Sequence, residues 1–138
     1  MKIIKSEIPF KTITLERTEY FGSCPSYKVN IDHSGEITYT GNNYVEKLGI
    51  HIWEVDQKTI VKIAKALENA DYFNLKKLEY VYLISTTDTP FCKTSVDLFS
   101  GEIRSIAHDL QEQDEWPVQL RRFEKRIDNI LGIGYEKF

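Results

Sequence analysis

Cys24, which precedes Pro25, and Arg17 offer the most specific chemistry in this sequence. A thiol becomes a nucleophile when a nearby cation such as Arg17 lowers its pKa. Free cysteine is, however, among the most buried residue types, and a small buried side chain that anchors its loop explains Cys24 as well. We favour this structural interpretation, which rapid alkylation of the native protein would contradict.

Arg17, Tyr27 and Asp88 are the other candidate ligand-contacting residues. The planar donor fork of Arg17 could bind a ligand carboxylate or phosphate, but we favour a role in fixing the carbonyls of the loop 21–25. Tyr27 alternates in phase with the apolar residues of its strand, so we expect it to face inward or across strands. Asp88 lies in a Thr-rich loop, where an Asx turn is favoured over a ligand contact. Together with Cys24, these residues form the predicted ligand- or partner-binding set.

The three histidines, His33, His51 and His108, show no H-x-x-x-H or H-E-x-x-H spacing, so the sequence predicts no metal site. His33 falls in a predicted turn, which is typical of a solvated residue. The sequence contains no P-loop, dinucleotide-binding or G-x-S-x-G motif. We therefore assign no catalytic residue, no metal and no cofactor.

The chain has 138 residues, enough for one domain that folds without disulfide or metal staples. Lys and Arg number 18 against 21 Asp and Glu, a formal net charge of −3, which argues against a nucleic-acid partner held through its phosphates. Aromatic residues make up 12% of the chain, which favours a sheet-rich fold. Neither an apolar signal region nor a membrane-spanning stretch is seen, so we expect a cytoplasmic protein without a membrane partner.

Alternating apolar residues predict four strands in the first third of the chain. They cover residues 13–15, 27–31, 37–39 and 44–53, with turns at 32–35 and 41–43. A bulge or bend is expected near Gly49 in the last of these strands.

Two amphipathic helices are predicted, with strands at 79–83, 92–99 and 102–107 between them. The first helix follows Asp56 as its N-cap, and its apolar face consists of Ile60, Ile63, Ala64 and Leu67. The second begins near Pro117 and ends before Gly132. Its apolar stripe consists of Leu120, Phe123, Ile127, Ile130 and Leu131.

The predicted element order is therefore β-β-β-β-α-β-β-β-α. Strands grouped between helices are typical of the α+β class, with a single antiparallel sheet and two amphipathic helices packed on one face. We expect one domain over residues 1–138, with frayed termini at 1–10 and 133–138.

The segment 14–29 carries an Arg-Thr pair followed by aromatic-Gly-x-Cys-Pro-x-Tyr, formed by Arg17, Thr18, Phe21, Gly22, Cys24, Pro25 and Tyr27. Gly35 and Tyr39-Thr40-Gly41 follow. This pattern resembles the opening of an uncharacterised bacterial family, domain of unknown function 6438. Later features are similar as well: residues 70–73, Asp88 shortly before a proline, and a last helix with Pro117, Leu120, Ile127 and Asp128. The resemblance runs from about Ile13 to Ile130 and implies a shared fold, but no activity, because the family has none assigned.

The sequence departs from the family pattern at Tyr20, which stands where the pattern has its first cysteine. A local Cys-x-x-x-Cys disulfide or metal clip is therefore impossible here, and Cys24 is left alone.

The balanced charge and the lack of catalytic motifs favour a non-enzymatic binding or protein-interaction module, for example an immunity- or inhibitor-like protein. Its partner would be a protein or a small ligand. The alternative is a small hydrolase-like enzyme whose site the fold assembles from dispersed His, Asp and Arg residues, such as a histidine with Asp88. A deep pocket that joins a histidine to a carboxylate would favour the enzyme.

Overall fold

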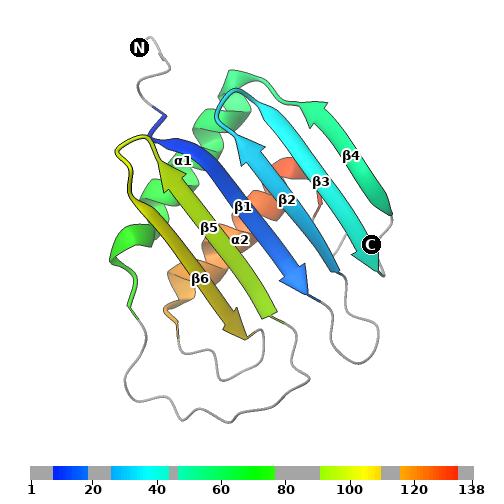
Figure 1. The fold of residues 1–138 in the computed structure, drawn as a ribbon. Coiled ribbons are helices and arrows are strands. Elements are labelled where there is room, and N and C mark those ends of the chain that lie inside the picture. The colour runs from blue at the N-terminus through cyan, green and yellow to red at the C-terminus, as the bar shows by residue number, and fades with distance from the viewer. Residues whose placement is uncertain (1–7, 19–25, 44–46, 77–90, 110–115, 134–138) are drawn as a thin grey trace.

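The computed structural model describes residues 8–18, 26–43, 47–76, 91–109 and 116–133. Within them lie six strands, two α-helices and a short 3-10 helix, η2 (Figure 1). In chain order these are β1 (Phe10–Thr18), β2 (Ser26–Asp32), β3 (Glu36–Asn43), β4 (Gly49–Glu54), α1 (Gln57–Ala70), η2 (Tyr72–Asn74), β5 (Phe91–Leu98), β6 (Ile103–Asp109) and α2 (Val118–Leu131).

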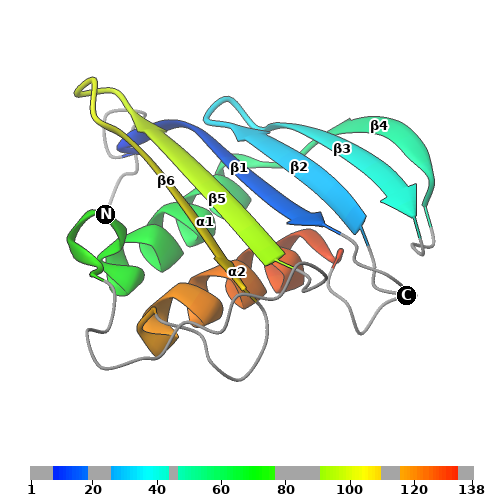
Figure 2. The same ribbon diagram turned by 60° about the horizontal axis from the view of Figure 1, so that its bottom comes forward.

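The six described strands form one antiparallel sheet in the order β4-β3-β2-β1-β5-β6. β1 lies between β2 and β5, so the N-terminal meander extends the sheet on one side and the β5–β6 hairpin extends it on the other. Both α-helices cover the same face of the sheet (Figures 1 and 2). The predicted α+β class is confirmed, and the strand predicted at 79–83 lies outside the described residues.

The turn between β2 and β3 is fixed by Asp32 and Gly35, as the sequence predicts. The Asp32 carboxylate accepts hydrogen bonds from the backbone N–H of Ser34 at 3.0 Å and from its hydroxyl at 2.5 Å, which lowers the pKa of Asp32. Gly35 has a φ of +107°, and a Cβ on it would lie 2.5 Å from the carbonyl oxygen of Val55. Only glycine fits this position.

The turn predicted at residues 41–43 is wrong, because these residues belong to β3. Gly41 pairs with Tyr27 whereas Asn43 pairs with Ser26, so a register shift absorbs one residue and lets the ladder continue through residues that usually form turns. Strand β4 begins at Gly49, the position of the expected bend, and not at residue 44. Residues 44–46 lie outside the described part of the chain.

Both helices begin where the sequence predicts, and α2 also ends where it predicts. Asp56 caps α1 by accepting the Thr59 N–H at 2.9 Å and the Thr59 hydroxyl at 2.7 Å. Gly132 ends α2 in the left-handed conformation, with a φ of +71°. No helix in the described part of the chain is long and apolar enough to cross a membrane.

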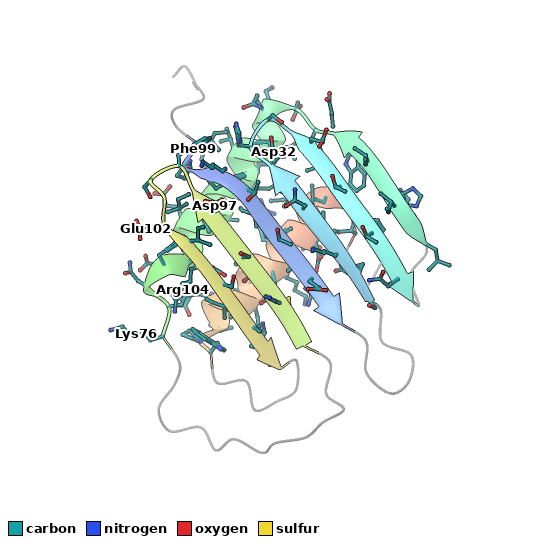
Figure 3. The ribbon with its side chains drawn as sticks, in the orientation of Figure 1. Asp32, Lys76, Asp97, Phe99, Glu102 and Arg104 are labelled. Carbon is teal, nitrogen blue, oxygen red and sulfur yellow. The ribbon has the colours of Figure 1, made fainter. Side chains whose placement is uncertain are left out.

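Arg104 fastens β6 to the segment that follows α1 (Figure 3). Its guanidinium donates hydrogen bonds to the carbonyl oxygens of Tyr72 at 2.8 Å and Leu75 at 2.7 Å. The Tyr72 hydroxyl in turn shares a hydrogen bond of 2.8 Å with the Thr94 hydroxyl on β5. These hydrogen bonds hold β5, β6 and the segment after α1 together at one side of the core between the helices and the sheet.

The helix-facing side of the sheet is apolar over most of its length, and its fully buried side chains include Ile13, Leu15, Val29, Ile31, Ile37 and Val96. At the end of the sheet where β1 and β6 finish and β2 and β5 begin, polar side chains take the place of these apolar ones on the same face.

Candidate functional site

Four neighbouring strands each place one inward side chain at the same level of the sheet. Arg17 on β1 pairs in register with Tyr27 on one side and with Cys92 on the other, and Cys92 pairs with His108. Each of the four is 4% exposed or less. Because every second residue of a strand faces the helices, the strand pairing alone brings these side chains together.

Helix α2 adds two carboxylates to this level of the core. Glu124 and Asp128 are four residues apart, so they lie on the same helix face, and each is 1% exposed. Figure 2 shows α2 crossing beneath the sheet. We call the resulting cluster the polar row; it consists of Tyr27, Arg17, Cys92, His108, Glu124 and Asp128.

One half of the polar row is a closed triangle of hydrogen bonds. Arg17 donates from Nη2 to Asp128 Oδ2 at 2.7 Å and from Nε to the Tyr27 hydroxyl at 2.9 Å. Tyr27 donates its own proton to Asp128 Oδ1 at 2.6 Å. Burial raises the pKa of Asp128 even though the Arg17 charge and the Tyr27 hydrogen bond act to lower it. The triangle joins β1, β2 and α2.

The other half of the polar row joins β5, β6 and α2. His108 Nε2 lies 2.5 Å from Glu124 Oε2, and the two side chains are 0% and 2% exposed. The Cys92 thiol lies beside them, and one donor atom from each of the three residues falls within 4.8 Å of the others. Sulfur, imidazole and carboxylate form a ligand set that suits transition metals such as Zn²⁺.

This arrangement does not favour Cys92 as a nucleophile. Burial and the neighbouring Glu124 carboxylate raise the pKa of the Cys92 thiol well above its ordinary value, so the thiol is protonated at neutral pH. A nucleophilic cysteine needs the opposite: an electropositive, partly exposed setting.

The structure brings together two of the four residues predicted to bind a ligand or partner. Arg17 and Tyr27 are hydrogen-bonded to each other, and Tyr27 faces inward as expected. Cys24 and Asp88 lie outside the described residues. Arg17 is buried and donates hydrogen bonds to Tyr27 and Asp128, while the loop 21–25, whose carbonyls it was predicted to fix, lies outside the described residues.

Cys92, His108, Glu124 and Asp128 are the residues that sequence reasoning missed as members of one site. One signal was present for the two carboxylates. Glu124 and Asp128 follow Phe123 and Ile127 directly, so on a helical wheel they border the apolar stripe that packs on the sheet. A carboxylate at such a position is buried and requires a partner.

The other two histidines lie away from the polar row in the fold. His33 lies in the β2–β3 turn, where its ring meets Phe99 edge-on at 4.8 Å. His51 is an exposed residue of β4, with Nε2 2.8 Å from the Leu48 carbonyl oxygen.

Three exposed large apolar side chains lie together on or directly before strand β4, at one edge of the sheet formed by the described strands. Leu48, Ile50 and Ile52 are 62%, 70% and 63% exposed. Ile50 and Ile52 pair with Thr40 and Thr38 of β3, and all four side chains point to the face without helices.

Comparison with known proteins places the chain in a family. No curated protein matches it. A family model described as "Domain of unknown function (DUF6438)" matches residues 11–131, which is most of the chain and agrees with the resemblance carried by Arg17, Tyr27 and Asp128. The chain therefore belongs to the DUF6438 family.

Proposed function

We propose that this domain is a non-enzymatic protein-interaction module that binds an extended segment of a partner protein along the edge of β4. The observation that carries the proposal is the exposure of Leu48, Ile50 and Ile52 on or beside an edge strand. An edge strand offers unpaired N–H and C=O groups, and proteins usually protect such edges with charged side chains, proline or bulges. An edge that presents isoleucines suits addition of a partner strand, in which main-chain hydrogen bonds supply affinity and side chains supply specificity.

The side chains around β4 define what the partner strand would carry. Ile50 and Ile52 would meet apolar residues at alternate positions of that strand. Beyond them, Glu54 lies directly opposite Glu36 on the same face, and both are exposed. Like charges opposite each other are unfavourable, so a Lys or Arg at the next alternate position would relieve their repulsion. The expected partner segment therefore reads apolar-x-apolar-x-basic, in either strand direction.

The proposal is tested by selecting binders from a library of displayed random peptides. We expect the selected peptides to share this alternating pattern, and Ile50→Lys with Ile52→Lys to reduce their affinity at least tenfold. Binding should also slow hydrogen exchange of the β4 amides. Ile103→Lys is the matched control, because Ile103 is 66% exposed on the same face of the opposite edge strand, β6.

Two results would overturn the proposal. One is a set of selected peptides that bind the Ile50→Lys, Ile52→Lys variant as well as the wild type. The other is protection of amides elsewhere while β4 exchange stays unchanged.

A small hydrolase is the second candidate, and the short contact between His108 and Glu124 is the observation in its favour. The burial of both side chains argues against it, because a substrate must reach the imidazole. Hydrolysis of simple esters by the wild type that is lost in His108→Gln would favour this candidate.

A further inference from the structure

We infer that Cys92, His108 and Glu124 form a binding site for a divalent transition-metal ion of the Zn²⁺ class. Each of the three residues lies sixteen positions from the next in sequence, so they form no short ligand motif. Strand register and helix packing bring them together.

The geometry of the donor atoms supports the site. The Cys92, His108 and Glu124 donor atoms all lie within 4.8 Å of one another. In a tetrahedral Zn²⁺ site, bonds of about 2.0–2.3 Å hold neighbouring ligand atoms roughly 3.3–3.8 Å apart. The 2.5 Å contact between His108 and Glu124 has to widen by roughly 1 Å to reach this range, and the Cys92 sulfur, within 4.8 Å of both, has to approach them by at most about the same amount. Each ligand comes from a different rigid element: β5, β6 and α2.

The charges of the polar row also fit a divalent ion. Arg17 and Asp128 form an ion pair at 2.7 Å and balance each other. A Zn²⁺ ion bound by the Cys92 thiolate, the Glu124 carboxylate and a neutral His108 imidazole forms a neutral unit, because its two positive charges are balanced by the thiolate and the carboxylate once the thiol proton has left to solvent. A buried site requires such neutrality, because an uncompensated charge in the core is strongly unfavourable. The remaining polar groups near the ligands, the Tyr27 and Tyr72 hydroxyls, have their own hydrogen-bond partners.

The surroundings of the ligands supply the support that metal sites need. Arg17 pairs with Cys92 in the sheet, and Asp128 lies one helical turn from Glu124. The triangle of Arg17, Tyr27 and Asp128 therefore ties α2, which carries Glu124, to β1, the strand that pairs with β5 and so with Cys92. Three protein ligands leave the fourth tetrahedral position for a water molecule.

The test uses the full chain, treated with chelator and titrated with Co²⁺, which reports thiolate ligation through its absorption spectrum. We expect one ion per chain, a thiolate-to-cobalt charge-transfer band, and loss of that band when Zn²⁺ is added. The decisive variant is Cys24→Ser, which leaves Cys92 as the sole thiol of the chain. The band should persist in Cys24→Ser and in the exposed-histidine control His51→Gln, and it should disappear in Cys92→Ser.

The same preparation gives a second measurement. Zn²⁺ should raise the Tm of the wild type and of His51→Gln, but not that of Glu124→Gln. A band that is absent from Cys24→Ser, or a Zn²⁺-induced Tm shift that is equal in Glu124→Gln, overturns the site. If Cys92→Ser fails to fold, the Cys24→Ser spectrum alone decides.

Discussion

Arg17 on β1 and Asp128 on α2 are 111 residues apart in sequence, yet their side chains meet at 2.7 Å in the core. They are 4% and 2% exposed, so neither charge can be hydrated by bulk water. The Tyr27 hydroxyl bridges them on the sheet side. This contact ties the last described helix to the central strand of the sheet.

Removing the Asp128 charge should destabilise the protein strongly. Asp128→Asn keeps the shape of the side chain but leaves the Arg17 charge uncompensated, and we expect a loss of about 3–5 kcal/mol in the free energy of unfolding. Urea denaturation followed by circular dichroism measures it. The control is Glu68→Gln, an exposed carboxylate on α1, which should change stability by less than about 0.5 kcal/mol. Equal effects of the two substitutions would show that the buried ion pair is not formed.

Two stacked tyrosines should respond differently to loss of the hydroxyl. The rings of Tyr27 and Tyr39 lie 5.8 Å apart and both are buried, but only the Tyr27 hydroxyl has hydrogen-bond partners among the described residues. We expect Tyr27→Phe to cost about 1–3 kcal/mol, because it leaves Asp128 and Arg17 each short of a bond. Tyr39→Phe should be neutral or stabilising, because it removes a buried polar atom without a partner. Thermal unfolding of the two single variants decides; a larger loss from Tyr39→Phe would contradict the hydrogen-bond assignment.

Alkaline pH should destabilise the fold through its buried tyrosines. Burial raises the pKa of Tyr72 from 10.0 to about 12, so between these values the native state holds a proton that the unfolded state has lost. Stability from this group is therefore fully present below about pH 10 and falls as the pH rises toward 12, by up to about 1.4 kcal/mol per pH unit.

Urea midpoints measured across this pH range test the effect. Tyr72→Phe should flatten the decline, because it removes the hydroxyl whose raised pKa contributes to it. A decline that is the same in Tyr72→Phe and the wild type would contradict the raised pKa.

Local structure could be predicted from sequence wherever a few neighbouring residues decide it. Asp56 accepts the N–H of Thr59 and so caps the start of α1, and Gly132 adopts the left-handed conformation that ends α2. These two helix boundaries could therefore be predicted from the sequence. The Asp32–Gly35 turn is equally local. The turn prediction for residues 41–43 failed because Gly and Asn favour turns in isolation, whereas pairing with β2 keeps these residues in strand β3.

The polar row could not be predicted, because its members meet only through long-range pairing. Arg17 and Cys92 become neighbours because β5 pairs with β1 and not with β4, the described strand that precedes β5 in the chain. Sequence patterns do not set this strand order. Arg17 and Tyr27 were singled out one at a time, but nothing local links either of them to Glu124 or His108.

The position of the two carboxylates on α2 has a consequence for synthesis of the chain. While the ribosome is still making residues beyond β6, Arg17 and His108 have neither Glu124 nor Asp128 to pair with, so the sheet cannot bury this level of its helix-facing side at low cost. The core therefore closes only after α2 has been synthesised. Folding of this domain then depends on contacts between residues that are far apart in sequence. A nascent chain stalled before α2 would therefore expose its sheet to chaperones and proteases instead of forming a stable intermediate.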